Sequence, residues 1–259
     1  MVTVASQPPV RSTSGGTPDA VFQPLADCGA GNPFFYHTFA DDFDINGKVL
    51  TNAYTVTTTG TGAAVASTPG DGGLILFTAP TAAGNASIQL ASASFTVNTL
   101  PKKVFFETRV KMSAWATAGV TALWGLIQTT ATPGTVTDGV YFALTAAGVL
   151  SINSMVGSVL TTAVIPAAAY TLTANVNVDL AFEITRQGDV LAYVDSQLVG
   201  YVPASNIGTT NGPQNAGAVA RLTAPTLTAV VLNPTLAIIQ TVATAITMTV
   251  DFFQAQKER

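Results

Sequence analysis

Ionisable side chains are scarce in this chain. Charged residues make up 9% of its 259 residues, with only three glutamates among them, and a single histidine is present. Enzymes that move protons or hold metal ions need clusters of titratable side chains. The composition therefore predicts no catalytic, metal-binding or cofactor-binding residues. It favours a protein that binds a partner or builds a structure over an enzyme.

Basic stripes and long apolar segments are also missing. The five lysines and five arginines are scattered, and the net charge is −4 with a pI of about 4.7. Nucleic-acid binding needs a basic stripe that displaces counterions, so we do not expect a nucleic-acid partner. No stretch reaches the ~18–20 uninterrupted apolar residues of a membrane helix. A membrane span is therefore not expected.

Features of an exported protein are lacking as well. Cys28 is the sole cysteine, so no internal disulfide can form. Residues 1–9 contain neither the basic region nor the apolar region of an ordinary signal peptide. Both observations favour assembly in the cytoplasm.

The first 33 residues differ in composition from the rest. Five prolines interrupt a segment rich in Ser, Thr and Gly. Such a segment cannot bury enough apolar surface to offset its ordering entropy. It suits lying across a neighbouring molecule, and packing on its own domain is the alternative. We predict an extended N-terminal arm over residues 1–33 and one domain over residues 34–259.

Short alternating runs predict strands throughout that domain. In residues 103–112 Phe106, Thr108, Val110 and Met112 point one way, while Phe105, Glu107, Arg109 and Lys111 point the other. This period of two predicts a strand with one buried face and one exposed, charged face.

Turn signals connect further strands into hairpins. Residues 180–202 read as three strands joined by two tight turns, and residues 139–152 read as another hairpin. Residues 206–217 are polar and turn-rich, which predicts a long loop inside one domain. No amphipathic segment of helical period and useful length occurs. The fold class is therefore all-β, an antiparallel jelly-roll β-sandwich with an extended N-terminal arm.

Five segments carry a family resemblance: Gly72–Phe77, Phe105–Lys111, Asp138–Phe142, Glu183–Asp195 and Thr247–Phe252. They resemble the concanavalin A-like lectin/glucanase (laminin G-like) jelly roll, particularly the versions found in tailed-phage virion proteins. The resemblance covers residues 34–253. In overall style the chain is similar to phage head-decoration (cement) proteins, with tail adhesins as the alternative.

The glutamates do not form the catalytic pattern of this fold. Its glycoside hydrolases pair two carboxylates on one strand, in a signature such as Glu-x-Asp-x-Glu. Glu107 and Glu183 supply only the first member, and each precedes an arginine, Arg109 or Arg186. We expect solvated charge pairs on exposed strand faces and no catalysis of this type.

An acidic turn is the one candidate for an ion. Residues 42–47 match the opening of a calcium loop, with oxygen ligands at alternating positions and a glycine for the turn. Ala53 stands where the bidentate acid of the twelfth position belongs. We expect an acidic turn leading into the first strands; an ion would require a carboxylate from a second loop.

Neither His37 nor Cys28 has a catalytic setting. His37 lies in an aromatic run, residues 34–39, and no serine or cysteine nucleophile motif accompanies it. We expect a packed or edge histidine. Cys28 lies in the arm as a small apolar side chain.

Two aromatic residues are candidates for stacking on a sugar ring. Trp115 lies just beyond the strand predicted for residues 103–112, with Tyr170 as the next candidate, whereas Trp124 lies mid-strand in residues 120–128. The alternative for Trp115 is an aromatic side chain folded onto the sandwich edge or into a subunit contact.

The residues and the resemblance together predict a non-enzymatic bacteriophage structural protein. The expected role is capsid decoration, stabilising the head shell through the jelly roll and the arm, with the major capsid protein and copies of itself as partners. It would lie on the capsid surface of the virion after assembly in the host cytoplasm. The alternative is a glycan-binding module of a tail or fibre adhesin, and an enzyme without a visible signature is a third hypothesis.

A homotrimer is the expected oligomer, with a monomer or dimer as the alternative. Phe105, together with Phe252 or Phe253, would point outward from a single sandwich and need cover. The resemblance supplies the threefold preference, because decorating jelly rolls often match local threefold axes of a shell, and closed symmetry avoids open-ended polymerisation.

Overall fold

The computed structural model describes most of the domain. The described residues are 36–41, 43, 50–68, 73–81, 83–91, 95–96, 102–115, 119–186, 188–203, 231–241 and 246–258. Within them the elements are sixteen β-strands and one short 3-10 turn, η1 (Leu50–Asn52). The all-β prediction is confirmed. The predicted arm, residues 1–33, and the predicted loop, residues 206–217, lie outside the described residues.

The first of two sheets, sheet I, has eight strands. In spatial order its strands are β14 (Gln197–Val202), β13 (Val190–Val194), β12 (Val178–Ile184), β7 (Val104–Met112), β16 (Thr247–Glu258), β4 (Leu74–Thr78) and β3 (Ala64–Thr68), and β1 (Tyr36–Asp41) pairs with the second half of β16.

The second sheet, sheet II, also has eight strands. In spatial order its strands are β11 (Val159–Val164), β10 (Leu150–Val156), β9 (Gly139–Leu144), β8 (Val120–Gln128), β15 (Val231–Gln240), β5 (Gly84–Leu90) and β2 (Tyr54–Thr59), and β6 (Phe95–Thr96) pairs with the start of β15.

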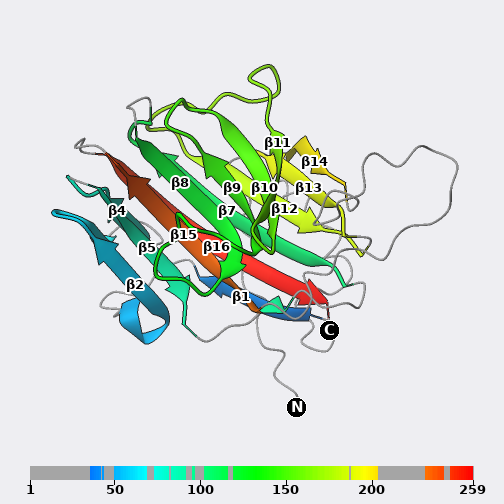
Figure 1. Ribbon diagram of the computed structural model, residues 1–259, viewed down its shortest axis with the longest axis horizontal. Coiled ribbons are helices and arrows are strands. Elements are labelled where there is room, and N and C mark those ends of the chain that lie inside the picture. The colour runs from blue at the N-terminus through cyan, green and yellow to red at the C-terminus, as the bar shows by residue number, and fades with distance from the viewer. Residues whose placement is uncertain are drawn as a thin grey trace, which may run out of the picture.

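The two sheets stack as the layers of a sandwich (Figure 1). Every described strand pair is antiparallel, and neighbours such as β7–β16 and β8–β15 come from distant parts of the chain. The predicted jelly-roll sandwich is therefore confirmed. The predicted hairpins are present as β9–β10 and as the meander β12–β13–β14.

Aromatic side chains from both sheets form the centre of the core. Phe182 of sheet I stacks on Phe106 with ring centroids 5.2 Å apart and also meets Phe142 of sheet II at 6.2 Å. Trp124, predicted mid-strand, is fully buried on β8 and donates its indole N–H to the sulfur of Met248 across the sandwich at 3.0 Å. These contacts join the sheets because alternate side chains of each strand point inward.

A buried tyrosine anchors the start of the domain. The Tyr54 hydroxyl donates to the Asp41 carboxylate, and the same carboxylate accepts the backbone N–H of Phe43 at 2.9 Å. The rings of Tyr54, Phe43 and Phe253 pack together at centroid distances of 5.8–6.2 Å. Burial, followed by the contact with Asp41, raises the pKa of Tyr54. The phenol therefore stays protonated and keeps its donor to Asp41.

A proline lies inside the central strand β15. On one side β15 pairs with β8 without interruption, whereas on the other β5 covers Thr235–Gln240 and β6 covers only residues 231–232. Pro234 falls where β5 and β6 leave a gap. A proline is tolerated there because it has no N–H to contribute to a ladder.

The prediction that β7 has one exposed face was wrong. Phe105 and Glu107 are each only 3% exposed, and Phe252 and Phe253 are buried too. The Lys103 ammonium, just before β7, lies over the Phe105 ring at 5.8 Å, and the Gln254 amide of the neighbouring strand β16 donates to Glu107 at 2.6 Å. The outward phenylalanines that motivated a trimer are thus covered within one chain.

Gly125 lies where the neighbouring strands β8 and β9 of sheet II approach each other closely. A Cβ at this position would meet the carbonyl oxygen of Val140 and would lie 2.5 Å from the Cα of Tyr141. Because both contacts are with backbone, the neighbouring strand must shift. We expect Gly125→Ala to lower the free energy of unfolding by about 1–3 kcal/mol, measured by urea denaturation.

Gly134→Ala is the matched control. Its added Cβ would meet only the Ile239 side chain, at an ordinary 3.7 Å. The variant should unfold within about 0.5 kcal/mol of the wild type. Equal stabilities of the two variants would contradict the close approach at Gly125.

Candidate functional site

Charged residues are distributed unequally between the two sheets. The strands of sheet II contain no Asp, Glu, Lys, Arg or His, whereas the described charges that lie in strands all belong to sheet I. The two outer faces therefore offer different chemistry. The strands of sheet II offer a ligand only hydrogen bonds and apolar contact.

The outer face of sheet II carries a line of amide and hydroxyl groups across the strands. The pairing registers place Gln89, Thr235, Gly125, Tyr141 and Asn153 side by side on β5, β15, β8, β9 and β10. Gly125 has no side chain, and Tyr141 lies directly opposite it. We call this line the polar row.

Hydrogen bonds fix the side chains of the polar row. The Tyr141 hydroxyl is hydrogen-bonded to Asn153, whose Oδ1 accepts from the Ser151 hydroxyl at 3.3 Å. Burial raises the pKa of Tyr141, although the bond to Asn153 acts in the opposite direction. On β5, Gln89 donates to the Thr235 hydroxyl at 2.7 Å and accepts from the backbone N–H of Thr130 at 3.1 Å. The row is held in place before any ligand arrives.

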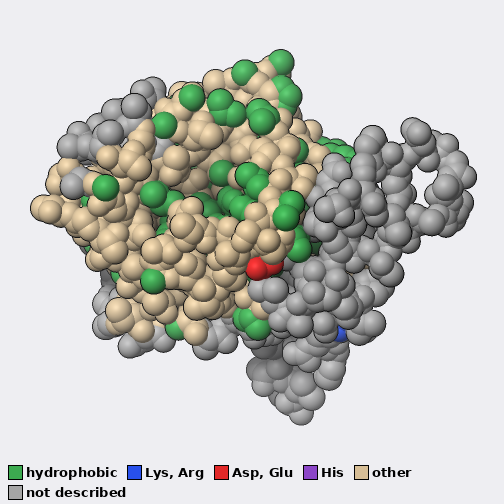
Figure 2. Space-filling model, in the orientation of Figure 1, with side chains coloured by type: hydrophobic (Ala, Val, Ile, Leu, Met, Phe, Trp, Pro, Cys, Tyr) green, Lys and Arg blue, Asp and Glu red, His purple; other side chains and the backbone are tan. Residues whose placement is uncertain are grey.

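An apolar cluster lies beside the polar row. Leu123, Ile127, Tyr141 and Ala237 form a buried group that is separate from the main core, and Val136 packs against it. Val136 belongs to the β8–β9 connection, which lies over the same face. Figure 2 shows a hollow in a face with almost no charged side chains and with hydrophobic side chains on its floor.

One buried acceptor on this face has no partner. No described residue donates a hydrogen bond to the Oδ1 atom of Asn85, and the residue is only 6% exposed. Its neighbours on β5, Ala86 and Ile88, point into the core, so Asn85 lies on the outer face. A buried acceptor without a donor costs about 1–3 kcal/mol, and a bound hydroxyl group would remove that cost.

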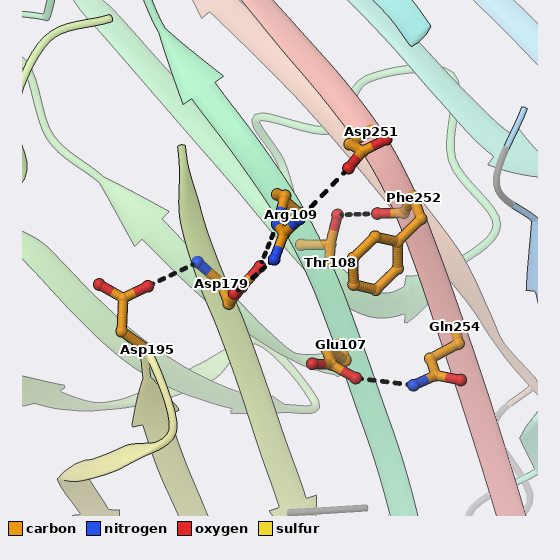
Figure 3. A network of polar contacts seen from close by, with 8 residues as sticks. All are labelled: Glu107, Thr108, Arg109, Asp179, Asp195, Asp251, Phe252 and Gln254. Atoms are coloured by element: carbon orange, nitrogen blue, oxygen red, sulfur yellow. Dashed lines mark hydrogen bonds and ion pairs between the residues drawn. The ribbon is translucent and has the colours of Figure 1, made fainter. Parts of the chain in front are cut away.

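The outer face of sheet I is instead a network of ion pairs (Figure 3). Arg109 binds Asp179 through two bonds, Nε–Oδ1 at 2.7 Å and a second N–O contact at 3.1 Å, and lies 3.6 Å from Asp251. Arg109 thereby joins β7 to both of its neighbours, β12 and β16. Such a two-point geometry is the strong form of an arginine–carboxylate pair.

A β-bulge brings Asp251 to this face. The register of β16 against β7 passes from Val250 opposite Val110 to Phe252 opposite Arg109, so Asp251 is the extra residue. Because of the insertion, Val250 and Phe253 both point into the core while Asp251 and Phe252 lie beside Arg109. A strand without a bulge would have placed Asp251 and Phe253 on the same face.

The other carboxylates of the strands in sheet I also have partners. Glu107 accepts from the Gln254 amide at 2.6 Å, Glu183 pairs with Lys103 at 2.7 Å, and Glu258 binds Arg186 through two bonds. The predicted solvated pairs of Glu107 with Arg109 and of Glu183 with Arg186 are therefore wrong. Each of these acids binds a residue outside its own strand instead of the arginine that follows it in the sequence.

Tyr170 extends this network at its edge. Its hydroxyl donates to the Asp195 carboxylate, which also accepts the backbone N–H of Asp179 at 3.0 Å. Burial, followed by the neighbouring carboxylates, raises the pKa of Tyr170. Tyr170 is half-buried and packs against the core. The side chain of this sugar-stacking candidate is therefore already used in a structural contact.

Trp115 also lies against the body of the sandwich. It is partly buried and packs on the core, and a Cβ added to Gly148 in the β9–β10 turn would collide with its indole ring. This is the edge-packed arrangement that was the alternative to a stacking platform. Trp115 and Tyr170 are therefore not among the side chains of the polar row.

The remaining sequence candidates are only partly described. His37 lies on β1 opposite Lys257, and its side chain is not among those described. Cys28 and, apart from Phe43, the acidic turn at residues 42–47 lie outside the described residues. Among the residues that are described, no group of three or more His, Cys, Asp or Glu could hold a metal ion. In the same part of the chain, no helix is long and apolar enough to cross a membrane.

Sequence reasoning missed the polar row entirely. The signal was present in residues 84–90 and 150–156, where Asn, Ser and Gln alternate with apolar residues and no charge occurs. Uncharged alternation predicts a strand, but it does not say which strands share a sheet. Only the pairing registers bring β5, β9 and β10 to one face.

Comparisons with known proteins agree on the fold. No protein-family model matches the chain, and no curated protein matches it. An endo-1,3-β-glucanase from Streptomyces sioyaensis superposes with a TM-score of 0.57 at 16% identity, over 87% of this chain and 97% of that one. The carbohydrate recognition domain of Emp46p superposes with a TM-score of 0.53 at 9% identity, over 83% and 94% of the two chains.

A phage protein is also similar in structure. A carbohydrate esterase from the Shiga toxin-encoding bacteriophage phi24B has a TM-score of 0.50 at 16% identity, over 85% of this chain and 98% of its own. Together these structures show that the chain has a concanavalin A-like lectin/glucanase jelly-roll fold. At such identities the likeness concerns the fold alone.

The Asp195 carboxyl should give the protein a pH-dependent stability. Burial raises its pKa above the ordinary value of about 4. The folded state thus binds this proton more tightly, and stability is lost as pH rises through the raised pKa. Asp195→Asn removes this dependence. Its stability relative to wild type should therefore increase between about pH 3 and pH 7, measured by urea denaturation.

Glu258→Gln is a control of opposite sign. Burial acts to raise the pKa of Glu258, but hydrogen bonds from Arg186 and the Lys103 backbone outweigh it and lower the pKa. This carboxylate stabilises the fold above its ordinary pKa, so the Gln variant should lose stability relative to wild type as pH rises. The same trend in both variants would contradict the assignment.

Proposed function

We propose that this chain is a non-enzymatic module that binds a neutral, hydroxyl-rich glycan on the outer face of sheet II. The observation that carries the proposal is the hollow of this face, which has almost no charged side chains and holds the polar row and the apolar cluster side by side. A neutral sugar presents the complementary surface: hydroxyl groups that donate and accept, and C–H faces that pack on apolar side chains.

Individual side chains of this face are complementary to a neutral sugar. Asn153 carries an amide, which can both donate and accept, and the orphaned Oδ1 of Asn85 needs a donor. Leu123 and Tyr141 supply apolar area. An ionic ligand would find no counter-charge on these strands, and burying an unpaired charge is costly.

The carboxylates argue for binding without hydrolysis. Glycosidases place two carboxyl groups about 5–10 Å apart on either side of the bond that is cleaved. The strands under the hollow contain no carboxylate, and those in the strands of sheet I are engaged with Arg109, Lys103, Arg186, Gln254 or, for Asp41, Tyr54. The names of similar structures, a glucanase and a carbohydrate recognition domain, support a sugar as the ligand.

Glycan-array binding with two variants tests this function. Asn153→Leu and Asn85→Leu each remove an amide from the face. Each should weaken binding to the recognised glycan by about five- to tenfold, the value of one hydrogen bond of roughly 1 kcal/mol. Binding should change little with added salt, because no charge lies on these strands.

Ser67→Ala is the control, since Ser67 is exposed on β3 of the other sheet, and it should bind as the wild type does. Release of reducing ends from the bound glycan would contradict the non-enzymatic part. Absence of binding to any neutral glycan on a broad array would refute the proposal.

Decoration of a phage capsid is the second candidate. The observations that favour it are the low-charge body of the chain and its similarity in fold to a bacteriophage protein. In this proposal the protein lies on the capsid surface, bound to the major capsid protein and to copies of itself, and residues 1–33 extend across neighbouring subunits.

Deletion of residues 1–33 tests the second candidate. The truncated chain should keep the β-rich circular dichroism and cooperative unfolding of the sandwich but lose attachment to capsid shells in a co-sedimentation assay, because the extra contact area is gone. Full attachment of the truncated protein would exclude a role for the arm.

A further inference from the structure

Large apolar side chains are exposed mainly along one side of the sandwich. Among the described residues the exposed large apolar side chains are Val149, Val159, Leu160, Val164, Val176, Leu198, Tyr201 and Val231. Five of these eight belong to β11 and β14, the edge strands of sheets II and I, which lie together. The opposite edge strands, β2 and β3, expose mainly Thr, Ala and Ser. The exposure is therefore a local property of the β11 side.

In the described part of the chain, β11 shows none of the usual protections of an edge strand. Within the part of the chain that the structure describes it pairs with β10 alone. Residues 159–164 contain no charge, no proline and no glycine, and their pairing with β10 shows no bulge. Natural proteins guard such edges with charges, prolines or bulges, because an open edge is a template for another strand. β14, by contrast, has a bulge in its register with β13.

The hairpin geometry fixes which backbone groups of β11 face outward. Gly157 and Ser158, both with positive φ, form a two-residue turn closed by the pair Val156–Val159. The closing pair of such a turn exchanges hydrogen bonds, so every second residue from Val159 faces β10. The bond from Ile165 N–H to the Leu150 carbonyl agrees with this. The backbone groups at positions 160, 162 and 164 therefore point to the open edge.

We propose that this edge pairs with β11 of a second copy of the chain. In an antiparallel pair about a two-fold axis at Thr162, Thr162 faces Thr162 of the second copy, and Leu160 faces its Val164. The three residues in this register are the three whose backbone groups point outward, so each pair can exchange both hydrogen bonds. Directly opposed residues of an antiparallel pair also lie on one face, as Leu160 and Val164 do.

The match of side chains identifies a second copy as the partner. Leu160 is 51% exposed and Val164 is 57% exposed in the single chain. The two-fold axis brings both of them into contact twice, once on each side of the central threonines. No like charges oppose each other, because β11 has no charge, and the closed two-fold arrangement joins the two copies of sheet II into one continuous sheet.

Charge substitutions at the opposed positions test both the partner and the register. In L160K/V164K, two lysine pairs would face each other across the axis. In L160K/V164E, each lysine would face a glutamate. Light scattering coupled to size-exclusion chromatography should give twice 26.5 kDa for the wild type. The Lys/Lys variant should dissociate about tenfold more readily or further, and the Lys/Glu variant should recover the dimer.

Val231→Lys is the matched control, because Val231 is also exposed (42%) but lies on β15, away from β11. It should remain dimeric, and circular dichroism and urea unfolding should show all variants folded. A wild-type mass of 26.5 kDa at every concentration would overturn the proposal. A trimer whose mass is the same in the Lys/Lys variant, or a Lys/Glu variant that stays dissociated, would overturn it as well.

Discussion

The insertion of one residue in β16 determines how sheet I is built. β16 pairs with β7 along its length, with β4 in its first half and with β1 in its second. Its apolar residues, Val250 before the bulge and Phe253 after it, are separated by an odd number of positions. A regular strand would expose one of the two. The bulge places both in the core and directs Asp251 toward Arg109, so the packing of the sandwich and the ion-pair network depend on the same irregularity.

The unequal distribution of charge gives each sheet its own means of cohesion. Sheet I binds its strands to one another on the outside through pairs such as Arg109–Asp179 and Lys103–Glu183. Sheet II uses neutral amides and hydroxyls for the same purpose, as in Gln89 with Thr235. Neutral groups can exchange a protein partner for a ligand hydroxyl at small cost, whereas separating a partly buried ion pair is expensive. For this reason sheet II is the better surface for reversible binding, and sheet I is the better scaffold.

Much of the fold could be predicted from the sequence because its signals are local. Period-two alternation located β7, turn signals located the hairpins, and the lack of any helical period excluded helices. The exposed face of β7 was predicted wrongly because alternation does not report contacts with a neighbouring strand, such as that of Glu107 with Gln254 of β16. The bulge at Asp251 was invisible for the same reason: it is defined only against the register of β7. The polar row could not be found because its members come from five strands whose order in the sheet is not encoded in any one segment.

The position of Pro234 has a consequence for how the domain opens. On the β5 side, the hydrogen-bond ladder of β15 is divided into a long section at Thr235–Gln240 and a short one at residues 231–232. A continuous ladder transmits fraying from one end to the other, but a break stops it. The short section with β6 can therefore separate from β15 as a small unit of low local stability while the long section stays closed.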